Sequence, residues 1–241
     1  MIDWLRRAPR EVPALEVAGQ TLPVVLRRTA AAKRMTLRLA PDGSEVRLTM
    51  PRWGRSADGL EFARSKTDWL AAQLARLPRP IELRDGAALR FLGEETILRH
   101  DPARSRRVRF ADGQLHAGGP IEALERRLVR WLEGEARRLF TADLEYYCAR
   151  AERPVPRLML SRARRRWGSC ARDGTLRINW RLVMAPEGVR RSVVAHEVAH
   201  LVHFDHSPHF HALLAQLYEG DIRHANRWLK AEGRSLYQPF G

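Results

Sequence analysis

The stretch "VVAHEVAHLVHFDHSPHF", residues 193–210, holds five of the nine histidines in the chain. His196 and His200 enclose Glu197 in an HExxH pattern, and positions i and i+4 of a helix lie on one face, where both imidazoles reach a single ion. Glu197 can then lie beside a metal-bound water, as a general base requires. The valines and leucines around these residues predict a buried helix, in which the imidazoles and the carboxylate need partners.

A catalytic zinc takes three protein ligands and leaves its fourth position to water. His203 follows His196 by seven residues, about 10 Å along a helix, so we expect it at the rim or in the second shell. Ser207-Pro208 predicts the start of another helix, which makes the chain turn at His206. We therefore expect His206 to be the third ligand. The alternatives are His209, Glu219 and Asp205.

The first half of the chain is predicted to be rich in strands. Alternating apolar and polar residues around turn signals predict hairpins over residues 15–29, 35–51 and 106–117. Further strands are expected over 88–91 and 96–100, and one helix over 56–77. The sequence Gly118-Gly119-Pro120 interrupts the pattern and predicts a boundary between domains at 1–118 and 119–241.

The second half is predicted to be mainly helical, which makes the fold class α+β. A long amphipathic helix is expected over residues 121–150. Two strands should then enclose a loop at 166–174 and lead to the HExxH helix. The strand over 175–182 is expected at a sheet edge, where a peptide substrate could pair with it, and this would place Asn179 and Trp180 near the cleft. The candidates for stabilising an oxyanion are His203, Tyr218, Tyr237 and Arg166.

The charge of the chain suggests which partners it attracts. A net charge of +15 and a pI near 11.2 favour phosphate backbones or anionic lipid surfaces. No apolar run is long enough for a membrane helix, and the N-terminus lacks the pattern of a signal peptide. Cys148 and Cys170 are too few for a disulfide framework. We therefore expect a cytoplasmic protein with no membrane partner and with nucleic acid as a candidate partner of its basic surface.

Three motifs carry a family resemblance: "RRWGSC" at 165–170, "INWRLVMAP" at 178–186 and the histidine-rich stretch. In this order they resemble the YgjP-like metallopeptidases, which are zincins similar to the SprT-like and WLM-type proteases. The resemblance implies a zincin-like catalytic half with a small sheet, in which His196, His200 and His206 bind zinc and Glu197 is the catalytic carboxylate. It also implies that Arg166–Cys170 is a signature of the fold and holds no nucleophile.

These observations predict a zinc metallopeptidase that hydrolyses peptide bonds through a zinc-activated water. Its substrate would be a peptide or protein. One alternative is a SprT-like protease that reaches DNA through the basic surface and acts on DNA-bound or crosslinked proteins. The other is a non-catalytic binding module in which zinc has a structural role.

Overall fold

The computed structural model describes residues 13–40, 43–75, 77, 81–164 and 166–240. The N-terminal segment used above to judge a signal peptide lies outside these ranges, as do Pro41, Asp42 and Arg165. The chain forms two compact units, Met1–Leu77 and Pro78–Gly241, which are described separately. The class is α+β, as expected. No helix within the described ranges has both the length and the apolar character needed to cross a membrane.

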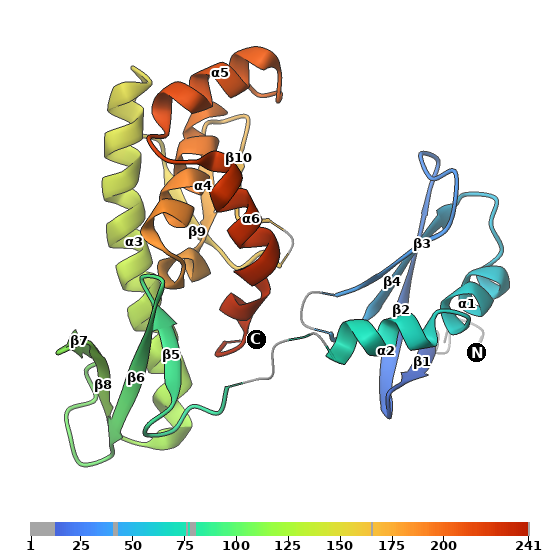
Figure 1. Ribbon diagram of the computed structural model, residues 1–241, viewed down its shortest axis with the longest axis horizontal. Coiled ribbons are helices and arrows are strands. Elements are labelled where there is room, and N and C mark those ends of the chain that lie inside the picture. The colour runs from blue at the N-terminus through green and yellow to red at the C-terminus, as the bar shows by residue number, and fades with distance from the viewer. Residues whose placement is uncertain (1–12, 41–42, 76, 78–80, 165, 241) are drawn as a thin grey trace, which may run out of the picture. The chain divides into compact units, whose positions relative to one another are not determined.

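The first unit is a four-stranded sheet with two helices. The order β1-β2-β4-β3 contains a central parallel pair between two antiparallel pairs. The strands are β1 (Ala14–Val17), β2 (Gln20–Thr29), β3 (Thr36–Leu39) and β4 (Val46–Pro51). The helices pack against the sheet and close a core that includes Val17, Leu48 and Leu70 (Figure 1).

The helix expected over residues 56–77 is two helices, α1 (Ser56–Arg64) and α2 (Thr67–Ala75). Ser65 ends α1, and its hydroxyl donates to the carbonyl of Phe62. The hydroxyl of Thr67 donates to the carbonyl of Arg64. These local side-chain bonds satisfy carbonyls at the end of α1 and so interrupt the helical ladder.

The second unit begins with another four-stranded sheet, of order β5-β6-β8-β7. Its strands are β5 (Ala88–Phe91), β6 (Glu94–Asp101), β7 (Arg109–Ala111) and β8 (Gln114–Gly118). Two antiparallel pairs again flank a parallel pair, so this sheet repeats the strand order of the first unit. The predicted hairpin with Asp112-Gly113 at its tip is confirmed.

Helices and a small sheet complete the second unit (Figure 1). A 3-10 turn, η1 (Ile121–Ala123), leads into the long helix α3 (Leu124–Arg150). The small sheet has the order β10-β11-β9. The remaining elements are β9 (Leu158–Ser161), β10 (Gly168–Cys170), β11 (Leu176–Asn179), η2 (Trp180–Met184), α4 (Glu187–Ala199), α5 (Pro208–Leu217), α6 (Ile222–Glu232) and η3 (Gly233–Tyr237).

The boundary expected between residues 118 and 119 falls inside the second unit. Strands β5–β8 share one apolar core with α3 and α4, through residues such as Leu98 and Leu128. The β5–β6 turn also bonds to the segment before α4, since the amides of Leu92 and Gly93 donate to the carbonyls of Val183 and Met184. The compact division therefore lies at Leu77, and β5–β8 belong with the helices that follow them.

A buried ion pair joins α3 to α4. The Nε atom of Arg190 lies 2.8 Å from Oδ2 of Asp143, and a second guanidinium nitrogen lies 3.3 Å from Oδ1. Only 5% and 6% of the two side chains are exposed. This bidentate contact fixes the first turn of α4 against α3 and so orients the helix that carries the HExxH pattern.

Candidate metal centre

His196 and His200 lie on the last turn of α4. The helix ends at Ala199, and His200 is its C-cap residue with helical backbone angles. The spacing of four residues therefore acts as predicted, and the Nε2 atoms of the two imidazoles are 3.2 Å apart. Both rings present the same nitrogen to a common point.

The chain turns at His206, as the Ser-Pro sequence after it predicted. Ser207 caps α5, its hydroxyl accepting from the amide of Phe210, and Pro208 is the first residue of the helix. This turn brings Nε2 of His206 to 3.2 Å from Nε2 of His196. The donor atoms of His196, His200 and His206 all lie within 4.8 Å of one another. The structure thus brings together the three residues expected to be ligands.

Burial favours the neutral form of His196 and His200, and a hydrogen bond fixes the tautomer of His200. Nδ1 of His200 lies 2.9 Å from the carbonyl oxygen of His203. Because a carbonyl can only accept, Nδ1 carries the proton, and the lone pair of His200 is on Nε2. Burial lowers the pKa of His196 to about 4, and burial also lowers the pKa of His200. Neutral imidazole is the form that binds metal.

Phe210 packs against all three imidazoles. Its ring centroid lies 5.0 Å from that of His196, 4.5 Å from that of His200 and 4.8 Å from that of His206. The side chain is fully buried on the first turn of α5. Sequence reasoning missed this residue, although its position three residues after the Ser207 cap places it on the turn nearest the histidines.

Glu197 is buried beside the histidines and has a free carboxylate oxygen. Its exposed fraction is 4%, and Oε2 has no hydrogen-bond partner among the described residues. Burial raises the pKa of Glu197 to about 7, against an opposing effect of the Arg166 charge. A buried oxygen without a partner is uncommon in proteins, and catalytic groups are among the exceptions. The carboxylate is poised to exchange a proton near neutral pH.

Gly168 on β10 packs directly against Glu197. A Cβ atom at this position would lie 2.3 Å from Oε1 and 2.6 Å from Cδ of the carboxyl group. Only glycine leaves room for the glutamate in this position. Part of the "RRWGSC" motif therefore shapes the space around the carboxylate, and Arg166 from the same motif supplies the nearby positive charge.

The other residues considered as metal ligands lie elsewhere. His203 and His209 stack on each other, with ring centroids 6.1 Å apart, and are not in the three-histidine cluster. His203 contributes to the centre through its backbone carbonyl. Asp205 accepts a hydrogen bond from the amide of Ser207, and Glu219 pairs with Arg191 at 2.5 Å.

Asn179 and Trp180, expected near the cleft, are buried in the interior. The side-chain amide of Asn179 donates to the carbonyl of Ala163, and its oxygen caps η2 by accepting from the amide of Arg181. Trp180 is 1% exposed, and the Arg181 guanidinium lies 4.7 Å from its ring. Their contacts are those of structural residues.

Tyr218 and Tyr237, considered as oxyanion stabilisers, also have structural partners. The hydroxyl of Tyr218 donates to the carbonyl of Gly188 at 2.9 Å. Gly188 precedes His196 by eight residues, about 12 Å along α4. The hydroxyl of Tyr237 donates to the carbonyl of Ala163. Both hydroxyls therefore donate to backbone carbonyls, and these bonds do not direct either of them to the three histidines.

The small sheet corrects the expected position of the edge strand. The segment 166–174, expected to be a loop, contains β10, which pairs antiparallel with β11. Strand β11 also pairs with β9 on its other side, so it is the central strand and its backbone groups are already used. A substrate strand therefore cannot add to β11, and the edge strands are β9 and β10, of which β10 contacts α4.

Comparison with known proteins gives one family match. The family described as "YgjP-like, metallopeptidase domain" matches residues 33–232. The chain belongs to this family. The matched range includes the three histidines, Glu197 and Gly168, and extends over most of both compact units. No curated protein and no solved structure matches the chain. As a YgjP-like metallopeptidase domain, the chain carries a histidine cluster that could bind metal, which fits hydrolytic activity.

Proposed function

We propose that this YgjP-like protein is a zinc-dependent peptidase in which His196, His200 and His206 bind zinc and Glu197 is the general base. One observation carries the proposal. Three imidazoles converge at the end of α4, and Glu197, the residue after His196, has a buried carboxylate whose Oε2 has no partner among the described residues. Three histidines and a glutamate form the donor set and base of a hydrolytic metal site.

The spacing of the nitrogens around His196 fits zinc, and all three donor atoms lie within 4.8 Å of one another. Zn–N bonds of about 2.0–2.1 Å in tetrahedral geometry separate two ligand nitrogens by about 3.3 Å. The Nε2 atoms of His200 and His206 each lie 3.2 Å from that of His196. Neutral nitrogen ligands suit zinc better than magnesium or calcium, which prefer oxygen.

The protein groups then have defined roles. Zinc at this centre would supply a Lewis acid that polarises the scissile carbonyl and acidifies a water molecule. Glu197 takes a proton from that water while the oxygen of the water attacks the carbonyl carbon. The same carboxyl group delivers the proton to the leaving nitrogen as the C–N bond breaks, which yields one acid and one amine. The burial that raises the pKa of Glu197 to about 7 suits both steps near neutral pH.

We propose that the edge of β10 binds the substrate backbone. An extended peptide can pair with a free strand edge through main-chain hydrogen bonds. Gly168 on β10 contacts Glu197, so a peptide on this edge would run beside the general base.

We place the reaction in the cytoplasm, which agrees with two cysteines that are both free.

The structural-zinc alternative makes a different prediction about coordination. A structural site has four protein ligands. Among the described residues the cluster has three members, and His203 and His209 contact each other instead. This arrangement favours a centre with an open position.

The test compares wild-type protein with Glu197→Gln and with Glu145→Gln, which changes an exposed glutamate of α3. All three should bind one zinc per chain. A proteome-derived peptide library should be cleaved by the wild type and by Glu145→Gln, and left intact by Glu197→Gln. Equal cleavage by Glu197→Gln would refute the assigned base. Spectra of cobalt-substituted protein that require four protein donors would refute the open metal site.

A further inference from the structure

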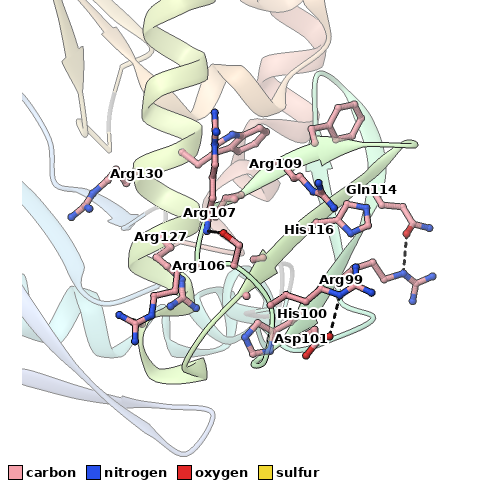
Figure 2. A pocket seen from close by; sticks show the side chains of 18 of the residues that line it. Arg99, His100, Asp101, Arg106, Arg107, Arg109, Gln114, His116, Arg127 and Arg130 are labelled. Carbon is pink, nitrogen blue, oxygen red and sulfur yellow. Dashed lines mark hydrogen bonds and ion pairs between the residues drawn. The ribbon is translucent and has the colours of Figure 1, made fainter.

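A large hollow lined by arginines lies in the second compact unit, outside the candidate metal centre (Figure 2). Its volume is about 1760 Å³, and it is formed by β5–β8, the loop between β6 and β7, and the first half of α3. Nine arginines and three carboxylates line it. None of the residues of the metal centre is among them.

Six of these arginines have, in the described part of the chain, neither a carboxylate partner nor a hydrogen bond to another side chain. They are Arg106, Arg107, Arg109, Arg126, Arg127 and Arg130. Figure 2 shows Arg106 from the loop and Arg127 from α3 close together, and Gly119 lies next to both. Like charges held together repel one another, and a concave wall strengthens their field. The hollow therefore favours a ligand that carries several negative charges.

Two of the arginines, Arg106 and Arg127, contact the backbone at Gly119 and Pro120. Nη2 of Arg127 donates to the carbonyl of Pro120 at 2.8 Å, while its buried Nε has no partner. At Gly119, where φ is +78°, a Cβ atom would lie 2.7 Å from Cγ of Arg106 and 3.0 Å from Nη1 of Arg127. The glycine thus lets two arginines cross the chain at close range. Such preorganised guanidinium groups match phosphate oxygens in geometry.

An exposed aromatic ring lies among these charges. Phe110 on β7 lines the hollow and is 44% exposed, and its ring lies 5.0 Å from that of Phe91. The ring centroid of Trp131 on α3 also lies 5.0 Å from that of Phe91. Basic grooves that carry aromatic platforms bind single-stranded nucleic acids, because phosphates meet the cations and bases stack on the rings. A flat lipid surface would not reach into a concave site.

We propose that the hollow binds single-stranded nucleic acid, with phosphates against the six arginines and a base on Phe110. The full chain carrying Glu197→Gln is titrated into a fluorescein-labelled oligothymidylate of 20 nucleotides, and anisotropy is followed at several salt concentrations. Contact with four to six phosphates predicts a slope of log K against log[salt] of about −3 to −4. No measurement here depends on peptide cleavage, so the result is independent of the proposed function.

Two charge-reversed proteins separate the hollow from the net charge. The double change Arg107→Glu and Arg130→Glu should weaken binding at least tenfold and reduce the salt slope. Arg153→Glu with Arg157→Glu gives the same net charge at exposed positions outside the hollow, and should change the affinity less than threefold. Equal losses in both proteins, or no binding by the parent, would overturn the proposal. All four arginines are exposed, so thermal unfolding should confirm that both proteins fold.

Phe110→Ala separates nucleic acid from other polyanions. It should weaken oligothymidylate binding several-fold and leave the binding of inorganic polyphosphate unchanged. Equal effects on both ligands would contradict base stacking. Tighter binding of a 20-base-pair duplex, or of vesicles containing phosphatidylserine, than of the single strand would assign the hollow to a different ligand and overturn the proposal.

Discussion

Replacing Gly168 with alanine tests whether β10 positions the general base. The added Cβ would lie 2.3 Å from Oε1 of Glu197, whereas ordinary contacts are 3.4 Å or longer. The two atoms must therefore separate by about 1 Å. Gly168 is paired with Ile178 in the small sheet, and α4 is fixed by the buried pair of Arg190 and Asp143. The carboxyl group of Glu197 is consequently the part that moves.

The expected effect is large on the rate and small on the metal. A shift of about 1 Å in a catalytic group reduces the rate on the order of 100-fold. The three atoms nearest to the alanine methyl all belong to Glu197, so zinc binding should persist. Crowding in a packed interior lowers the free energy of unfolding by about 1–3 kcal/mol.

The assay measures kcat on a peptide identified from the cleavage profile, together with zinc per chain and urea unfolding. Gly134→Ala is the matched control, because a Cβ at this exposed position of α3 meets nothing within 4 Å. The control should keep full activity and gain up to about 1 kcal/mol of stability from helix propensity. If Gly168→Ala keeps more than half of the wild-type kcat with zinc bound, or if it loses its zinc, Gly168 does not act by positioning the carboxylate.

Three further changes test other contacts. Phe210→Leu should weaken zinc binding by about 10–100-fold, because the ring supports all three imidazoles. Competition with a chromophoric chelator measures the Kd for zinc, and an unchanged Kd would show that this support is unimportant. Asp143→Ala leaves the buried Arg190 guanidinium with only the exposed Glu187 carboxylate, at 3.6 Å, and should cost about 3–5 kcal/mol in urea unfolding; a loss below about 1 kcal/mol would contradict this. In zinc-free protein, the raised pKa of Glu197 means that its protonated form stabilises the fold below pH 4.5 and that this contribution is lost as pH rises through 7. The free energy of unfolding of Glu197→Gln relative to wild type should therefore rise by up to about 3 kcal/mol between pH 4.5 and pH 7. A difference between the two proteins that does not change with pH would refute the raised pKa.

The sequence predicted the parts of the centre that depend on local geometry. The spacing of His196 and His200 is sufficient to place two imidazoles on one face of a helix. The Ser-Pro sequence predicts a helix start, and a chain that turns there returns His206 to the preceding helix. Each of these inferences uses residues within one or two turns of each other. The structure reproduces the turn and the convergence of the three side chains.

The sequence could not show contacts between distant segments. Gly168 and Glu197 lie 29 positions apart, and nothing in either segment reveals that a strand packs against the glutamate. Strand β10 has three residues, too few for an alternating pattern to be recognised. The order of strands in a sheet is also a nonlocal property, which is why β11 was expected at the edge and is found in the centre.

Gly118-Gly119-Pro120 shows how a breaker can be misread. Glycine and proline predict an interruption of regular structure, which a domain boundary and a tight packing site share. Here a Cβ on Gly118 would lie 2.3 Å from the carbonyl oxygen of Arg104, so the β6–β7 loop packs directly on the glycine. The segment therefore ends β8 inside a compact unit and supports the arginine-lined hollow.

The protonation state and orientation of the histidine side chains explain why the folded protein should bind a metal ion. Burial makes His196 and His200 neutral, and the carbonyl of His203 directs the lone pair of His200 toward the other two imidazoles. The Nε2 atoms of His200 and His206 each lie 3.2 Å from that of His196, and a cation between the imidazoles can bind a lone pair from each of them. Binding of metal should therefore stabilise the folded protein, by about 4 kcal/mol when the free ion is at 1,000 times its Kd. The burial that keeps His196 and His200 neutral thus also favours the binding of a cation.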